Sequence, residues 1–116
     1  MALRFRDFVA FLKREIAHAP ETQTVVVLSP PMEDVPGRWE TLVTLRNTSD
    51  VRREDYVQVE AYDGEVWHSA VTGWQMPSLP GGVRQCWFFI ETDTEPTAFR
   101  VTLSDRTIEL DVDTLV

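Results

Sequence analysis

The chain has 116 residues, a formal net charge of −8 and a hydrophobic fraction of 43%. This length allows one domain with a sizeable core, and the apolar and aromatic content excludes a disordered chain. An acidic surface repels phosphate groups, so direct binding to nucleic acid or to an anionic membrane surface is disfavoured. We therefore expect residues 1–116 to form a single domain whose partner is another protein.

The N-terminal stretch and the cysteine content bear on the cellular compartment. Charged residues interrupt the apolar pieces of the N-terminus, so no signal peptide is visible, and no apolar run approaches the length of a membrane span. Cys86 is the one cysteine and cannot form an internal disulfide. The absence of disulfides fits a reducing compartment, and we expect a cytoplasmic protein.

Residues 3–18 have the pattern of an amphipathic α-helix, and the pattern stops before Pro20. At the helical period, five apolar side chains share an arc of about 100°, which Phe11 and Leu3 do not enter. The stripe consists of Phe5, Phe8, Val9, Leu12 and Ile16. Burial contributes about 1.5–3 kcal/mol per side chain of this kind, so we expect the helix to pack on the sandwich of residues 22–113. Docking on a partner protein or on a membrane surface is the alternative.

The remaining sequence predicts about seven short strands separated by turns, which favours an antiparallel β-sandwich over alternating strands and helices. The strands are expected over residues 22–29, 38–46, 55–62, 65–72, 83–91, 97–104 and 107–113. The first is apolar almost throughout, so we expect it to be buried on both faces, between the helix and the sheet.

The prolines that follow the first strand bound a loop containing Glu33 and Asp34. Two neighbouring carboxylates can act as a general acid and base or bind a hard cation. No further ligand type lies at a useful spacing here, so the pattern favours a solvated loop.

The strands at 38–46 and 55–62 alternate apolar and polar residues, which is typical of a half-buried antiparallel pair. Residues 47–49 (Asn-Thr-Ser) form the polar turn after the first of them, where such side chains hydrogen-bond the backbone. Asp63 and Gly64 are expected to supply the two positive-φ positions of a tight hairpin turn into the next strand.

Residues 73–82 contain two prolines and three glycines and are expected to form a long loop. The segment holds Trp74, Met76 and Leu79, three large apolar side chains in a connection that should be polar. They either cap the end of the sandwich or form a contact patch, since Trp and Met are enriched at interface centres. We take them as candidate partner-binding residues.

The strand at 83–91 is the most hydrophobic and is expected at the centre of a sheet. In the last strand, Glu109, Asp111 and Asp113 alternate with apolar residues and would form an acidic row on one face. Such a row on a terminal strand usually prevents edge-to-edge aggregation. The alternative is a docking face for a basic partner, which makes these acids candidate partner-binding residues as well.

Residue types that carry catalysis are sparse. No phosphate-binding loop, nucleophile elbow or zinc-binding helix motif occurs. Cys86 lies in an apolar strand and no histidine stands at a spacing that indicates pairing, so an inert packed thiol is expected; a reactive thiol is the alternative. The chain has too few Cys and His residues for a tetrahedral zinc site. We expect no enzyme activity, no cofactor and no metal site.

Four stretches form a recognisable set: L-V-T-L-R-N-T-S-D at residues 42–50, V-Q-V-E-A-Y-D-G-E-V at 57–66, L-P-G-G at 79–82 and F-R-V-T-L at 99–103. Together they resemble small prokaryotic immunoglobulin-like β-sandwich domains of the FxLYD type. In that family a strand ending in Asn-x-Ser/Thr precedes a strand ending in Tyr-Asp and a proline-glycine turn. The resemblance implies an export-associated domain with no catalytic residues. The N-terminal helix and the lack of an export signal depart from that family.

The sequence thus predicts a mainly β protein, an antiparallel immunoglobulin-like β-sandwich with one N-terminal amphipathic helix. Its expected function is a non-catalytic protein-interaction module that binds through Trp74, Met76 and Leu79 or through an exposed sheet edge. The alternative is a phage-like acidic decoy or inhibitor that occupies a basic, nucleic-acid-binding groove of its partner. A homodimer through a sheet edge or through the N-terminal helix is a further alternative.

Overall fold

The computed structural model describes residues 24–104 and 106–115, and the helix expected over residues 3–18 lies outside them. The described chain contains nine β-strands and a final turn of 3-10 helix, with no α-helix in these ranges. The elements are β1 (Thr24–Leu28), β2 (Met32–Val35), β3 (Arg38–Asn47), β4 (Arg53–Tyr62), β5 (Trp67–Ser69), β6 (Trp74–Ser78), β7 (Val83–Glu91), β8 (Ala98–Thr102), β9 (Thr107–Asp111) and η1 (Val112–Leu115). Each expected strand region contains a strand, whereas β2 and β6 lie in segments expected to be loops. None of the helical structure in the described chain has the length and hydropathy needed to cross a membrane.

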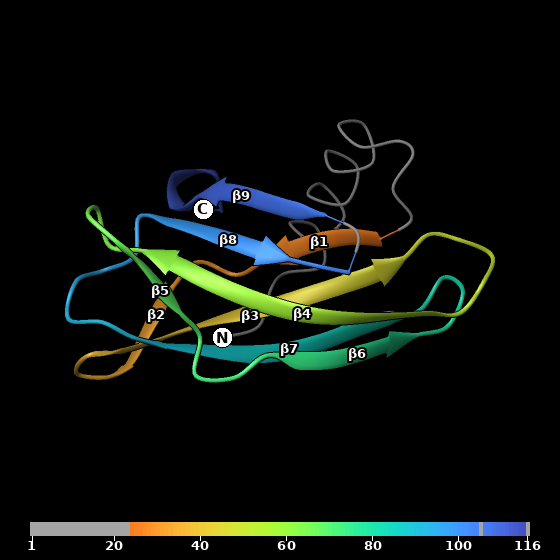
Figure 1. Cartoon of the computed structure of the whole chain (residues 1–116), viewed down its shortest axis with the longest axis horizontal. Coiled ribbons are helices and arrows are strands. Elements are labelled where there is room, and N and C mark those ends of the chain that lie inside the picture. The colour runs from red at the N-terminus through yellow and green to blue at the C-terminus, as the bar shows by residue number, and fades with distance from the viewer. Residues whose placement is uncertain (1–23, 105, 116) are drawn as a thin grey trace.

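Two antiparallel sheets, of four and five strands, form a sandwich (Figure 1). In the β3 sheet, β3 pairs with β7 on one side and with β1 and β2, end to end, on the other. In the β4 sheet, β4 pairs with β8 on one side and with β5 and β6 on the other, and β9 extends the sheet beyond β8. The predicted class of fold is therefore confirmed, although the number of strands is larger than expected.

The core lies between the sheets and is built from alternate residues of each strand. Val43 and Leu45 of β3 belong to it, as do Val57, Val59 and Ala61 of β4, which confirms the alternation read from the sequence. The other members are Val26, Leu28, Met76, Phe88, Ile90, Phe99, Val101 and Leu103. Because each fully buried large side chain contributes about 1.5–3 kcal/mol, this cluster is the main source of stability among the described residues.

β1 is buried on both faces, as its unbroken apolar run predicted. Some of its residues join the main core, while Val25 and Val27 point to the opposite face of the sheet. Leu110 of β9 and Leu115 of η1 pack against these two valines. The C-terminal elements therefore reach around the side of the sandwich to the β1 edge.

β7 is an edge strand, so its predicted central position is wrong. Among the described strands it pairs only with β3. Phe88 and Ile90 enter the core, and alternation places the half-buried Trp87 and Phe89 on the outer face of the β3 sheet. The hydrophobicity of β7 therefore reflects apolar residues on both faces of this sheet rather than two neighbouring strands.

Asn47 fixes the turn that ends β3, where a polar turn was predicted. Its Oδ1 accepts hydrogen bonds from the backbone N–H and the hydroxyl of Ser49, at 3.0 and 2.6 Å. Its Nδ2 donates to the carbonyls of Val51 and Ser78 at 2.8 and 3.2 Å. Because Ser78 ends β6, this fully buried side chain ties the β3 sheet to the β4 sheet.

The β4–β5 turn is longer than the two-residue hairpin turn predicted at Asp63 and Gly64. Only Gly64 has a positive φ there, and the pairing of Tyr62 with Trp67 leaves a loop over residues 63–66. Asp63 has a negative φ. It acts through its side chain, because its Oδ1 accepts hydrogen bonds from the N–H groups of Glu65 and Val66 in the loop. A capped four-residue loop replaces the tight turn.

The acidic pair of the expected loop lies on β2, in a short hairpin with β3. Asp34 is 3.4 Å from Nε of Arg38, and Glu33 Oε2 accepts a hydrogen bond from the N–H of Gly37 at 3.4 Å. Gly37 has a φ of 82°, which allows the reversal between the two strands. The loop prediction was therefore wrong, but both acids are exposed and interact within their own hairpin.

Candidate functional site

Half of the expected loop at residues 73–82 is a strand, because residues 74–78 form β6, which pairs with β4 over its whole length. Alternation places both Met76 and Trp74 on the inward face of β6. Met76 is in the core with 4% exposure, whereas Trp74, the first residue of the strand, is 46% exposed and Leu79, after its last residue, is 63% exposed. For Met76 the burial fits the alternative in which the segment packs on the sandwich, and this side chain is not available to a partner. Trp74 begins β6 and Leu79 follows its last residue, so the two exposed side chains lie at opposite ends of the strand.

β6 borders the β4 sheet, and its free edge offers little backbone to a pairing strand. Pro77 has no N–H, and its carbonyl accepts a hydrogen bond from Nε of Arg84 in β7 at 2.7 Å. Proline on an edge strand prevents strand addition. Side chains beside this edge, rather than its backbone, are therefore the feature that a partner could contact.

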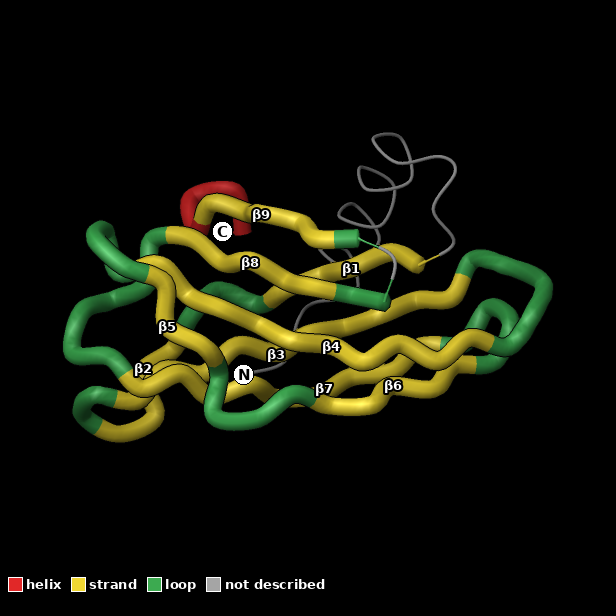
Figure 2. Tube along the Cα trace, in the orientation of Figure 1, coloured by secondary structure: helices red, strands yellow, loops and turns green. Residues whose placement is uncertain are grey.

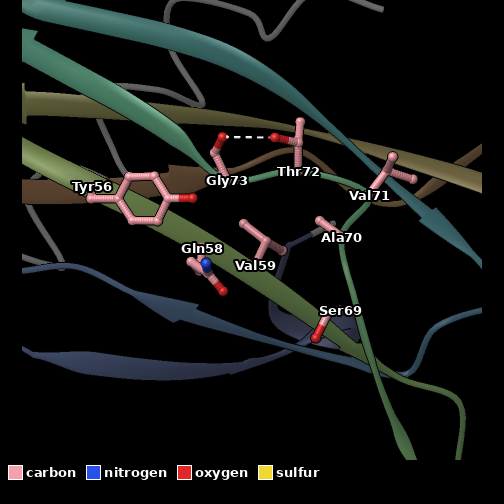
Figure 3. Close-up of a pocket in the computed structure, with 8 residues that line it drawn as sticks. All are labelled: Tyr56, Gln58, Val59, Ser69, Ala70, Val71, Thr72 and Gly73. Carbon is pink, nitrogen blue, oxygen red and sulfur yellow. Dashed lines mark hydrogen bonds between the residues drawn. The ribbon is translucent and has the colours of Figure 1, made fainter.

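A hollow of about 370 Å³ lies where the chain leaves β5 and enters β6, and Figure 3 shows the eight residues that line it. The N–H of Ala70 still bonds the carbonyl of Val59 in β4 at 2.8 Å, but the N–H of Val71 bonds the carbonyl of Phe89 in β7 at 2.9 Å. The connection thus crosses to the other sheet and returns, along one side of the sandwich in Figure 2. This detour separates it from β4 and opens the hollow.

Tyr56 lies over Gly73 at the rim of the hollow. A Cβ atom on Gly73 would be 2.6 Å from Oη of Tyr56, so this position of the ring requires glycine. Figure 3 shows the Tyr56 hydroxyl directed toward this side of the hollow. Tyr56 is 47% exposed and Val71 is 65% exposed, and Trp74 follows Gly73 directly. Tyr56 and Val71 line the hollow, whereas Trp74 lies outside its lining and, in register with the buried Val57, is on the other face of the β4 sheet from Tyr56. We call these three exposed side chains the apolar edge.

A second hollow, of about 480 Å³, contains a histidine–aspartate pair beside the β4–β5 turn. His68 Nε2 lies 2.7 Å from Oδ2 of Asp63, whose Oδ1 accepts the hydrogen bonds of the turn. The hydrogen bond with His68, followed by those from the loop N–H groups, lowers the pKa of Asp63 to about 2. Glu91 and Asp93 also line this hollow, yet no group of three potential ligands within residues 24–104 and 106–115 is close enough to hold a metal ion. Both Asp63 oxygens serve the turn and His68, so the pair has a structural role.

The acidic row is shorter than the sequence predicted. Glu109 and Asp111 are exposed on β9, but the strand ends at Asp111, and Asp113 lies in η1. Arg100 of β8 lies 3.6 Å from Glu109 and donates two hydrogen bonds to Glu60. The outer face of the β4 sheet is therefore a mixed polar surface rather than a uniformly acidic one.

Cys86 has the environment of a packed thiol. Its side chain packs against the main core, and its Sγ lies 3.7 Å from the carbonyl of Trp87. Burial raises the pKa of this thiol. A raised pKa lowers the thiolate fraction, and the thiolate is the nucleophilic form.

Sequence reasoning missed two of the three residues of the apolar edge. Tyr56 stands at an outward position of a strand whose alternate residues are buried, so an aromatic side chain there was a visible signal. Val71 was expected inside the strand at 65–72. Val71 is exposed because the chain leaves β4 after β5 ends at Ser69. No local sequence pattern predicts the point at which the chain leaves β4.

The described fold defines the chain as a small β-sandwich domain. No family model matches the chain, and no curated protein matches it. A FixG-related protein from Vibrio parahaemolyticus is similar over 78% of this chain and 93% of its own, with a TM-score of 0.51 and 13% identity. At this identity the likeness shows the fold alone, a two-sheet β-sandwich.

Two β-glucosidases contain a region of similar structure. The enzyme from Erythrobacter marinus is similar over 75% of this chain, with a TM-score of 0.48 and 18% identity. The enzyme DesR from Streptomyces venezuelae is similar over 76% of this chain, with a TM-score of 0.47 and 11% identity. The chain spans 15% of the length of each enzyme.

Proposed function

We propose that the protein is a non-catalytic interaction module that binds another protein through the apolar edge formed by Tyr56, Val71 and Trp74. The observation that carries this proposal is the exposure of Tyr56 and Val71 around one hollow, at 47% and 65%, with Trp74, 46% exposed, directly after the lining residue Gly73. Aromatic side chains of this kind are enriched at the centres of protein interfaces. The module would act in the cytoplasm, which the single unpaired cysteine supports.

The chemistry of the hollow suggests what the partner presents. Gln58, Ser69 and Thr72 line it with polar groups, while Tyr56 and Val71 supply apolar surface at its rim. A partner side chain with an apolar body and a polar tip would satisfy both kinds of surface. Trp74, at the start of β6, would widen the contact beyond the hollow.

We further propose that the sandwich is immunoglobulin-like and of the FxLYD type. Two antiparallel sheets and the Asn-x-Ser turn at Asn47 support an immunoglobulin-like sandwich of the FxLYD type.

The acidic decoy has less support than the apolar edge. It requires a continuous row of free carboxylates, whereas Arg100 lies beside Glu109 and Asp113 has left the strand. The two functions differ in their response to salt, since charge attraction between exposed groups is screened and apolar contact is not.

The test is capture of proteins from the native cell extract by the immobilised full chain, with identification by mass spectrometry. Trp74→Ser and Val71→Ser should each reduce capture of the same partner, and raised salt should leave the capture by the unchanged chain intact. Both variants should keep their stability within about 1 kcal/mol, because the side chains are exposed.

Val66→Ser is the matched control, because Val66 is a comparably exposed valine on the β4–β5 loop, outside the apolar edge. It should capture the partner as the unchanged chain does. Equal capture by all three variants would contradict the proposal. Capture that is lost at raised salt and in a Glu109→Gln, Asp111→Asn variant would support the decoy instead.

A further inference from the structure

The centre of the outer face of the β3 sheet is buried, although a sandwich of this kind needs only its inner faces to be so. Leu42 and Thr44 alternate with the core residues of β3 and therefore point outward, yet they are 8% and 0% exposed. Val25 and Val27 of β1 point to the same face and are also buried. Trp87, opposite Leu42 in the register, continues the apolar surface across β7.

The described residues that contact this face lie along its borders. Leu110 and Leu115 pack on the two valines from the β9 side. Gln85 of β7 donates a hydrogen bond from Nε2 to the hydroxyl of Thr44 at 3.0 Å. The guanidinium carbon of Arg38, on β3, lies 4.2 Å from the centre of the ring of Phe89, on β7. Between these borders lies a strip around Leu42 that runs along β3.

We propose that this strip is the docking site of the N-terminal segment, and that the stripe of Phe5, Phe8, Val9, Leu12 and Ile16 covers it within the same chain. The 23 residues that precede the described structure enter it at Thr24, the first residue of β1, in this same sheet. Arg106 donates a hydrogen bond to the carbonyl of Thr24 and so fixes this point of entry. The C-terminal end of this segment therefore lies beside the strip that the segment would cover.

The dimensions of the segment and the strip agree. A helix over residues 3–18 would be about 24 Å long, which matches about seven residues of an extended strand. Residues 19–23 span at most about 18 Å when extended, enough to reverse the chain from the strip to the start of β1. Tethering keeps the segment at millimolar effective concentration, so a second copy would have to compete with it.

Charge favours the same arrangement. Residues 1–15 carry Arg4, Arg6, Lys13 and Arg14 against Asp7 and Glu15, a net charge of +2, so residues 16–116 carry −10. The outward positions of β3 and β7 around the strip hold Glu40 and Glu91 but also Arg38, opposite Glu91. The attraction would therefore come from the net charge of the rest of the chain rather than from an acidic patch on the strip.

The first test measures where the segment lies in the full chain. A nitroxide on Ala10→Cys, in a Cys86→Ser background, would sit on the side of the expected helix opposite the stripe. We expect selective loss of NMR amide signal at Val27, Leu42 and Thr44, with weaker loss at Thr102 on the far sheet. A mixture of isotope-labelled chain without nitroxide and unlabelled chain with it should show no such loss. Loss in the mixture would mean that a second copy docks, and no selective loss in either sample would overturn the proposal.

The second test retains Cys86 and does not depend on that background. Leu12→Asp places a charge in the stripe, and Phe11→Asp places the same charge outside it. Leu12→Asp should increase the fluorescence of a dye that binds exposed apolar surface and speed hydrogen exchange at Leu42 and Thr44, while Phe11→Asp should leave both unchanged. Equal behaviour of the two variants would overturn the assignment of the stripe to this strip.

Discussion

The two sheets share one core, but their outer faces differ. On the β3 sheet, Leu42 and Thr44 are buried although they point away from the core. On the β4 sheet, the corresponding outward positions hold Gln58, Glu60 and Arg100, which are polar and at least partly exposed. A sheet that faces water on one side alternates apolar and polar residues, whereas a sheet covered on both sides does not.

This difference is the one that docking of the N-terminal segment, as proposed above, would produce: the β3 sheet would be a middle layer and the β4 sheet an outer layer. The polar outer face of the β4 sheet is organised by Arg100, which bonds Glu60, lies beside Glu109 and stacks at 4.2 Å over the ring of Trp67. Such a set of contacts orders long side chains in water and adds little stability. The apolar outer face of the β3 sheet should therefore matter far more to folding.

The largest expected effect comes from placing the same charge on each outer face. Leu42→Asp should destabilise the protein by about 3–5 kcal/mol, because it puts an unpaired carboxylate where no water reaches. Thr102→Asp, on the outer face of the β4 sheet, should change the free energy of unfolding by about 1 kcal/mol or less. Urea unfolding followed by tryptophan fluorescence measures both values.

Leu42→Met is the control for the first variant, since it keeps an apolar side chain of similar volume and should cost less than about 1.5 kcal/mol. If Leu42→Asp were tolerated as well as Thr102→Asp, the outer face of the β3 sheet would be accessible to water. The contrast between the two sheets would then be one of composition only.

The comparison also shows what the sequence could and could not predict. Alternation identified the inward residues of β3 and β4, because their outward partners are mostly polar. It misplaced β7, since apolar residues on both faces are expected equally of a central strand and of an edge strand with a covered outer face. It missed β6, because Pro77 and the flanking glycines indicate a loop, although proline is compatible with an edge strand.

The candidate site was predicted in part for similar reasons. Met76 is buried because it takes an inward position within β6, whereas Trp74 shares that face but is the first residue of the strand and Leu79 follows its last, and both are exposed. Asp113 is not part of the acidic row, because β9 ends at Asp111 rather than at the expected residue 113. Tyr56 joins the site through a non-local contact with Gly73, and such contacts depend on where the chain crosses between sheets rather than on any local pattern.

A smaller effect tests the polar face directly. Glu60→Gln removes the charge that accepts two hydrogen bonds from Arg100, at 2.9 and 3.0 Å. It should cost about 0.5–1 kcal/mol, because the pair is partly exposed and Arg100 keeps other contacts. Urea unfolding at low and high salt measures this, and the difference between variant and unchanged chain should shrink as salt rises. A cost near that of Leu42→Asp would mean that the two outer faces contribute alike.

The smallest expected effect concerns pH and the loop at the end of the polar sheet. Hydrogen bonds lower the pKa of Asp63 from 3.8 to about 2, so ionised Asp63 stabilises the folded state above its unfolded pKa. That contribution should be lost as the pH falls from about 4 to about 2, because the unfolded chain binds the proton first. The melting temperature of Asp63→Asn should lie below that of the unchanged chain near neutral pH and approach it across this window.

Glu65→Gln, a charge change on the same loop, is the control, and the difference between its melting temperature and that of the unchanged chain should not vary with pH across this window. A constant gap for Asp63→Asn would show that the hydrogen-bond geometry of the loop, rather than the charge of Asp63, stabilises the hairpin.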